Sequence, residues 1–298
     1  MSQQLLIGSI LAIVMVLSSA CTVTEMDYSK SIGSSSASEA SAKRHDEGRN
    51  KDEEAADTLI QLGLGYLRKG DRQRARVNLL KALQKNDRSG AAHNALALLF
   101  QLEGENELAE EHFKKSISLE PELTRLRFNY SIFLLRQQRY DDAFKELTIA
   151  SEDINYPRRG HVFFNLGLIS KQLGNADEAQ QAWEKATKLS PKLAGPFLEL
   201  AEMFFQAGDY PKAKRYLAHY EKLSKPTPGA LWLGVRLEHA FGNKDGEASK
   251  ALALKNLFPY SKETIEYKAW LKARKKGVKN LFPPIKDTFE SQDILKAP

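Results

Sequence analysis

The segment LIQLGLGYLRKGDRQRARVNLLKALQKND, residues 59–87, recurs in altered form four more times along the chain, at a spacing of about 34 residues. A small side chain marks the same position in every copy: Ala75, Ala109, Ala143, Ala179 and Ala213. A large side chain follows four residues later: Leu79, Phe113, Leu147, Trp183 and Leu217. A third shared position comes three residues after that: Ala82, Ser116, Ala150, Ala186 and Tyr220. This regular spacing predicts a stack of similar structural units.

Each copy predicts a hairpin of two α-helices. The small residue lets the two helices approach closely, while Gly63 and Gly167 make room inside the first helices. Pro121 and Pro191 are expected to stop second helices. The first helices are expected to end at turn glycines: Gly70, Gly104, Gly174 and Gly208. These positions resemble the tetratricopeptide repeat, which implies an all-α, right-handed superhelix of about six helix-turn-helix repeats.

The end of the repeat array is less regular. The sixth copy, residues 230–259, keeps the pattern at Ala248 and Leu252, as terminal repeats often diverge where they have no neighbour. Between the third and fourth copies, NYPRRG at residues 155–160 lengthens the spacing by about two residues. We expect a local break in the superhelix there. Residues 261–276 predict a capping helix that partly buries Ile265, Tyr267, Trp270 and Leu271.

The amino-terminal residues predict export. An apolar run from Leu5 to Leu17 is followed by small residues and is shorter than the about 20 residues of a spanning helix. The small residues end at Cys21, the single cysteine, in a pattern that resembles the bacterial lipobox, although Ser18 stands where leucine is usual. The resemblance implies acylation of Cys21, cleavage before it and, because Thr22 is not aspartate, transfer to the outer membrane. An uncleaved anchor, or ordinary export with a chance cysteine, is the alternative.

The chain therefore divides into four predicted segments. The stretch after Cys21 is rich in serine and charge and has few apolar residues, so it cannot bury enough surface to fold. About 30 such residues have a root-mean-square reach of roughly 30 Å and would serve as a tether. The predicted segments are a signal peptide at 1–20, the lipidated cysteine and tether at 21–50, the repeat domain at 51–273, and an extended or disordered tail at 274–298.

Composition and motifs favour no catalytic function. The 298 residues carry a net charge of +6, with 44 basic and 38 acidic residues mixed along the chain, which argues against nucleic-acid binding. No phosphate loop, serine elbow or cysteine nucleophile is present, so we expect no enzyme activity, cofactor or small-molecule substrate. The basic residues of the first repeat are predicted to be solvated, with lipid headgroups or an acidic partner as the alternative: Arg68, Lys69, Arg72, Arg74 and Arg76. The histidines lack metal-ligand spacing: His45, His93, His112, His161, His219 and His239.

The first helix of each repeat has two apolar faces, which suggests a binding groove. In the first repeat we assign Leu59, Leu62 and Tyr66 to packing within the hairpin. The other face is then expected to line the concave interior and to bind an apolar peptide or helix. The predicted partner-binding residues are Ile60, Leu64, Leu67, Asn94, Leu98, Phe128, Ile132, Leu135, Phe164 and Leu168. The alternative is a groove filled by repeat packing or by the tail, with Leu281, Phe282 and Ile285.

The order of these features resembles a known family. A lipobox-like cysteine, a polar tether and the segments IQLGLGYL, residues 60–67, and YPRRGHVFFNLGL, residues 156–168, are similar to the PilF and PilW lipoproteins of type IV pilus biogenesis. The resemblance covers about residues 55–272. It implies a pilotin, anchored to the outer membrane by acylated Cys21, with its repeats in the periplasm. Such a protein binds the pilus secretin and promotes its localisation and multimer assembly. The alternative is another outer-membrane adaptor lipoprotein, for β-barrel assembly or cell-wall hydrolases.

Overall fold

The structure is a computed structural model that describes residues 51–276. The predicted signal peptide, Cys21, the tether and the tail beyond residue 276 lie outside the described residues. Within residues 51–276 the chain forms thirteen α-helices and no strand, so the all-α prediction is confirmed.

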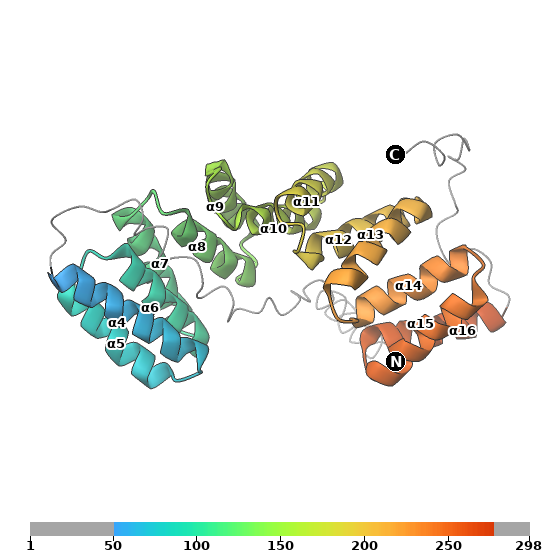
Figure 1. Ribbon diagram of the computed structural model, residues 1–298, viewed down its shortest axis with the longest axis horizontal. Helices are drawn as coiled ribbons and strands as arrows, with labels where there is room; N and C mark the ends of the chain where they lie inside the picture. The colour runs from blue at the N-terminus through green and yellow to red at the C-terminus, as the bar shows by residue number, and fades with distance from the viewer. Residues whose placement is uncertain (1–50, 277–298) are drawn as a thin grey trace, which may run out of the picture. The chain divides into compact units, whose positions relative to one another are not determined.

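The helices follow one another as six hairpins and a final single helix (Figure 1). The last helix, α16, packs against both helices of the sixth hairpin and ends at Lys275, two residues beyond the predicted domain boundary at 273. The hairpins are α4 (Lys51–Arg68) with α5 (Arg72–Lys85), α6 (Gly90–Glu103) with α7 (Asn106–Leu119), α8 (Thr124–Arg136) with α9 (Tyr140–Glu152), α10 (Arg159–Gln172) with α11 (Ala176–Leu189), α12 (Ala194–Gln206) with α13 (Tyr210–Leu223), and α14 (Pro228–Ala240) with α15 (Lys244–Leu257), followed by α16 (Lys262–Lys275).

The hairpins group into two compact units that divide at Pro121. The first unit contains α4 to α7 and the second contains α8 to α16. The segment of the predicted break, residues 155–160, is packed inside the second unit, and the predicted change in the superhelix there stays a prediction. The Tyr156 ring lies with its centroid 6.1 Å from that of Phe128, and the Arg159 Nε donates a hydrogen bond to the Ser151 carbonyl over 2.8 Å.

The turns inside the hairpins depend on backbone with positive φ. The four predicted turn glycines have φ between 78° and 84°, which confirms that they end the first helices. Gly242 does the same in the sixth hairpin, with φ 69°. The third hairpin has no glycine here, and Gln138 adopts φ 59° instead. Its N–H donates to the Leu135 carbonyl, and the next N–H, of Arg139, donates to Leu134, each over 3.0 Å.

The close helix approach predicted from the small residues is confirmed. The repeated alanines are all fully buried: Ala75, Ala109, Ala143, Ala179 and Ala213. A Cβ on Gly63 would lie 2.6 Å from a Leu79 methyl carbon, and a Cβ on Gly167 would lie 2.3 Å from the Trp183 Nε1. That indole N–H donates to the Phe164 carbonyl over 3.2 Å. Each glycine therefore makes room for the large residue of its own hairpin.

The sixth hairpin keeps the repeat in a register different from the predicted one. The buried residues of α15 are Ala251 and Leu254, whereas Ala248 is exposed and Leu252 is 54% exposed. Ala251 and Leu254 follow Leu217 and Tyr220 by the same spacing of about 34 residues. The register prediction failed because Glu247 occupies the alanine position. There it accepts bonds from both His239 Nδ1, at 2.9 Å, and Arg274, at 2.6 Å.

The capping helix is confirmed, with one exception among its predicted buried residues. Tyr267 and Trp270 are buried in a cluster with Leu231, Trp232 and Val235, and Leu271 packs against that cluster. Ile265 is 63% exposed, so its predicted burial is wrong. At helical spacing it lies away from the buried stripe of Thr264, Tyr267 and Trp270.

Candidate functional site

The predicted groove residues do not form an exposed apolar surface. Seven are buried: Ile60, Leu64, Leu67, Asn94, Leu98, Phe128 and Phe164. Three are half-buried: Ile132, Leu135 and Leu168. The prediction of an open groove at these positions is therefore wrong, and their burial agrees with the alternative of repeat packing. The physical reason is that a first helix such as α4 packs on its own second helix and also on the first helix of the next hairpin, α6.

The exposed face of α4 is the one that the sequence assigned to packing. Leu62 is 45% exposed, and Leu59 and Tyr66 are half-buried. At the equivalent positions of α6, about 34 residues later, Leu96 is 0% and Phe100 is 8% exposed. An internal hairpin thus buries this face, while in the described residues no hairpin precedes α4.

The first hairpin therefore presents what we name the open stacking face: Leu59, Leu62 and Tyr66 of α4 with Arg74 of α5. The Arg74 guanidinium lies 5.5 Å from the centroid of the Tyr66 ring. In the second hairpin, Phe100 occupies the position of Tyr66. The guanidinium of Arg76, from the preceding hairpin, covers it and lies 5.3 Å from the ring centroid. The open stacking face thus has the side chains of a helix-packing surface, and no helix within residues 51–276 covers it.

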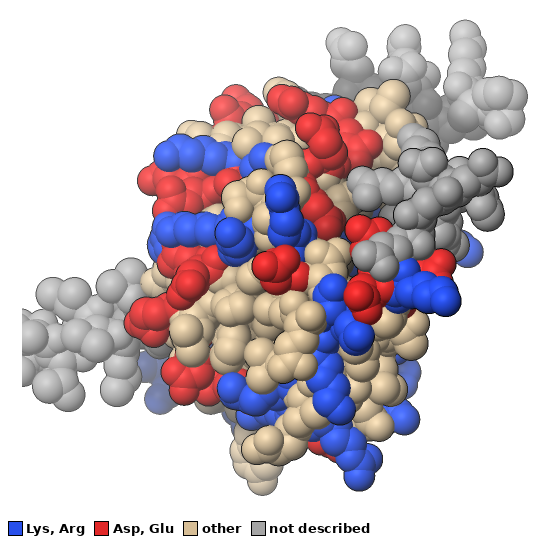
Figure 2. All heavy atoms as spheres, turned by 90° about the vertical axis from the view of Figure 1, so that its left-hand side faces the viewer, with Lys and Arg blue, Asp and Glu red and all other residues tan. Residues whose placement is uncertain are grey.

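The charges near this face are largely balanced. Figure 2 shows basic and acidic side chains interspersed over the upper part of this side, and a run of basic side chains beside uncharged surface lower down. Arg76 is paired with Glu103, Arg74 lies 3.4 Å from Asp71, and Lys85 lies 3.0 Å from Asp52. These ion pairs favour the interpretation of the first-repeat arginines as solvated helix residues, each worth little to stability.

Ion pairs connect successive first helices in the second unit. Lys171 of α10 lies 2.8 Å from Glu199 of α12, and Arg236 of α14 lies 2.7 Å from Glu202 of α12. The Arg236 guanidinium is also 4.6 Å from the Phe205 ring centroid. The sequence analysis missed these pairs. In the sequence, each pair consists of opposite charges about 28 to 34 residues apart. A search for apolar stripes does not detect such pairs.

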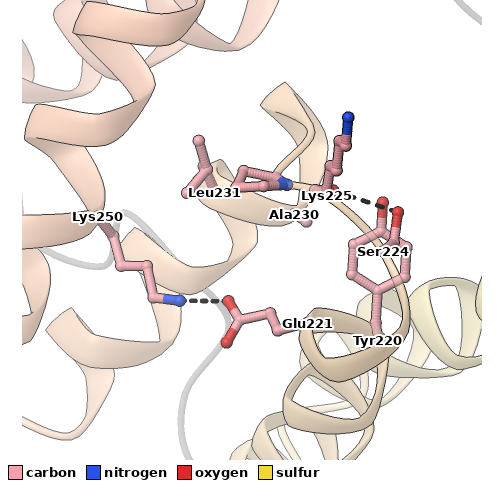
Figure 3. A pocket seen from close by; sticks show the side chains of 8 residues that line it. Tyr220, Glu221, Ser224, Lys225, Ala230, Leu231 and Lys250 are labelled. Carbon is pink, nitrogen blue, oxygen red and sulfur yellow. Dashed lines mark hydrogen bonds and ion pairs between the residues drawn. The ribbon is translucent and has the colours of Figure 1, made fainter.

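A small hollow lies where α13 meets α14, and it too was not predicted (Figure 3). The ion pair of Lys250 with Glu221 crosses its edge, and the Tyr220 hydroxyl is 3.0 Å from that of Thr227. Its volume of about 130 Å³ is below the roughly 300 Å³ at which small-molecule sites begin. Its lining residues are Tyr220, Glu221, Ser224, Lys225, Pro226, Ala230, Leu231 and Lys250.

The titratable side chains with shifted pKa values are dispersed. His93 Nδ1 and His112 Nδ1 are 3.1 Å apart, and burial lowers the pKa of both. Burial lowers the pKa of His161 to about 4 and raises the pKa of Tyr156 to about 12. In residues 51–276 no three or more His, Cys, Asp or Glu side chains gather as metal ligands would. Nor does that range contain a helix with the length and apolar character needed to cross a bilayer.

Comparison with known proteins agrees with the repeat structure. Models of the tetratricopeptide repeat match residues 60–124 and 160–193. The chain is 39% identical over 224 residues to the type IV pilus assembly protein PilF of Pseudomonas aeruginosa, covering 75% of this chain and 88% of that protein. An uncharacterized protein of Haemophilus influenzae is 30% identical over 146 residues, which are 49% of this chain and 82% of that protein.

Two solved structures extend the similarity to the fold. The structure of Pseudomonas aeruginosa PilF has a TM-score of 0.72 and 38% identity, over 74% of this chain and 99% of that one. The structure of PilW, described as a widely conserved type IV pilus biogenesis factor, has a TM-score of 0.63 and 25% identity. It covers 72% of this chain and 97% of its own.

Proposed function

Because the chain belongs to the PilF family of type IV pilus assembly proteins, we propose that it acts as a pilotin. In this role it binds the pilus secretin, carries or retains it at the outer membrane, and promotes its assembly into the multimeric channel. The repeats supply recognition and carry out no reaction. The acyl chains on Cys21 attach the protein to the outer membrane, and the tether leaves the repeats in the periplasm.

The observation that carries the recognition step is the open stacking face. Leu62 exposes 45% of its surface, whereas Leu96 exposes none at the same position of the next hairpin. An apolar helix from a partner would bury this surface as an additional hairpin does. Each 100 Å² of apolar surface removed from water contributes roughly 2.5 kcal/mol before the entropic cost of association. This surface replaces the predicted groove as the proposed secretin contact.

The test compares two charge substitutions in the first hairpin of the full chain. Leu62→Glu places a carboxylate on the open stacking face, where a partner helix would have to desolvate it. Val77→Glu, on α5, is the matched control, because Val77 is 50% exposed and Glu111, at the same position of the next hairpin, is also exposed, so hairpin stacking does not use this position. Secretin recovered with the protein from solubilised outer membranes, and secretin multimers resolved on gels, should fall at least tenfold for Leu62→Glu and stay unchanged for Val77→Glu.

Thermal unfolding must accompany the test. Both variants should unfold close to the unchanged chain, because both side chains are exposed. Normal secretin multimers with Leu62→Glu would reject this contact surface. Normal multimers in a strain that lacks the protein altogether would reject the pilotin function itself and favour the adaptor alternative.

A further inference from the structure

Helix α16 packs one face against the sixth hairpin and exposes the opposite face to solvent. Thr264, Tyr267 and Trp270 point into the core of the sixth hairpin. On the opposite side, exposed residues recur at spacings of three and four, which places them on one face of the helix. We name this the lysine face of α16, and its members are Ile265, Lys268, Ala269, Lys272 and Lys276.

The charge of the lysine face is unbalanced. In residues 51–276, Lys268, Lys272 and Lys276 make no ion pair. The acidic residues of α16 lie to one side of this face by helical spacing, and Glu266 is 3.5 Å from Lys262. The one arginine of the helix, Arg274, is turned toward α15, where it pairs with Glu247 at 2.6 Å. The lysine face therefore carries only positive charge.

Exposed apolar side chains lie near these lysines. Ile265 is 63% exposed in the second turn of α16, and Tyr260, just before the helix, is 94% exposed. Protein interfaces favour arginine and are depleted in lysine, so a face of lysines alone is a poor match for a protein partner. Lysine is well suited to headgroup phosphates, which it binds as a point charge, and an exposed tyrosine and isoleucine suit the interfacial layer of a bilayer.

We propose that the lysine face of α16 docks on an anionic phospholipid surface. The inference rests in part on the proposed lipid anchor, because the predicted tether, with a reach of roughly 30 Å, would keep the repeat domain near the membrane at high effective concentration. Attraction of about 1 kcal/mol per lysine corresponds to about fivefold in the docked population for each lysine. Three lysines are then enough to orient a domain that the tether already confines. Docking is peripheral, because the apolar side of α16 is occupied by the protein core.

The experiment uses the full acylated chain in phosphatidylethanolamine vesicles, with or without phosphatidylglycerol. Ala269→Cys places a fluorescent label on the lysine face, and Gln181→Cys on α11 is the matched control, since both positions are exposed. Within the second unit α11 lies well away from α16 (Figure 1). Headgroup-nitroxide lipids should quench the label at 269 far more than the label at 181, and only when phosphatidylglycerol is present. High salt should abolish the difference.

A second variant tests the charge. Lys268→Gln with Lys272→Gln should lower the ratio of docked to undocked protein by about 30-fold, the loss of about 1 kcal/mol from each lysine. Both side chains are exposed, so the thermal unfolding midpoint should not change. Equal quenching at 269 and 181, or quenching that ignores phosphatidylglycerol and salt, would overturn the proposal and leave an acidic protein or a second copy of the chain as occupant.

Failure of the anchor is distinguishable from failure of docking. The chain without an added cysteine takes up no label if Cys21 is acylated, and takes up one label if it is not. In the second case the anchor proposal is wrong, and docking is decided by co-sedimentation of the same chain with phosphatidylglycerol vesicles. Salt-sensitive binding that the double lysine variant loses would support docking, and absence of such binding would overturn it.

Discussion

At the scale of single residues, the turns of the hairpins show how one backbone requirement recurs with different side chains. Among the described residues, Gln138 alone has positive φ without being a glycine. It lies where every other described hairpin has glycine: Gly70, Gly104, Gly174, Gly208 and Gly242. For an L-residue this conformation costs roughly 1 kcal/mol, because Cβ crowds the following carbonyl oxygen. The third hairpin therefore carries strain that its neighbours avoid.

Replacing this glutamine should stabilise the protein. Gln138→Gly removes the crowded Cβ and is expected to raise the free energy of unfolding by about 1 kcal/mol. Denaturant unfolding measures the change. The adjacent Gln137→Gly is the control, since Gln137 has φ −81° and gains nothing from losing its side chain. If both variants are destabilised alike, the left-handed turn is not a source of strain.

His161 gives a pH dependence at the same scale. Its Nδ1 is buried with no hydrogen-bond partner in the described residues, and burial, helped by Arg158, lowers its pKa from 6.5 to about 4. Below pH 6.5 the unfolded chain binds a proton that the folded chain refuses until about pH 4. The free energy of unfolding should therefore fall as the pH is lowered through this interval. His93 and His112 shift in the same direction and add to the effect.

The measurement is denaturant unfolding in steps between pH 7 and pH 4. His161→Gln cannot take up the proton, so its stability should depend less steeply on pH than that of the unchanged chain. Gln181→Ala is the control, because Gln181 is exposed and carries no titratable group, so its replacement should leave the slope as it was. An unaltered slope in His161→Gln would show that this histidine does not carry the acid sensitivity.

At the scale of elements, the two apolar faces of α4 are reversed relative to the prediction. The face predicted to line a groove is buried, and the face predicted to pack within the hairpin contains the exposed Leu62. Ile60, Leu64 and Leu67 are buried, and Leu62 is 45% exposed. The pattern LIQLGLGYL predicts that both faces are apolar, which is correct. It does not contain the information on which face meets α6, because that depends on how the following hairpin stacks.

A pair of substitutions in α4 distinguishes the two faces. Leu64→Glu puts a carboxylate at a position only 4% exposed and should lower the free energy of unfolding by about 3 kcal/mol or more. Leu62→Glu makes the same chemical change two residues away and should cost well under 1 kcal/mol. Circular dichroism during heating reports both. The reverse order of stabilities would mean that Leu64, and not Leu62, faces solvent.

At the scale of the whole molecule, the described hairpins form two compact units, and the predicted membrane attachment depends on residues outside them. Cys21 is the single cysteine, so it is the one residue that can carry a thioether-linked lipid. If the proposed anchor is correct, we expect the cellular location to depend on this one side chain, with no change in the repeat domain.

Cys21→Ser should therefore abolish incorporation of a tagged fatty acid and remove the protein from the outer membrane, while leaving its helicity unchanged. Ser18→Leu is the matched control in the same segment. It places leucine three residues before the cysteine, as in the usual lipobox, and should be labelled at least as strongly as the unchanged chain. Label that persists in Cys21→Ser would contradict lipidation at this position.

The sequence by itself determined the repeat. The period, the turn glycines and the fully buried alanines follow from contacts inside one hairpin, such as Gly167 against Trp183, which chain neighbours about 16 residues apart must make in every copy. The same reasoning recovered the capping helix from its apolar stripe, and in the structure Ser261 accepts a bond from the Thr264 N–H at its start.

Only the tertiary structure decided what each hairpin presents to its surroundings. Leu62 and Leu96 occupy the same position of the repeat, yet one is 45% exposed and the other fully buried, because a hairpin precedes the second and none in the described residues precedes the first. Periodicity is a local property of the chain, whereas burial depends on which neighbour is stacked against each face, and the sequence of one hairpin does not record its neighbours.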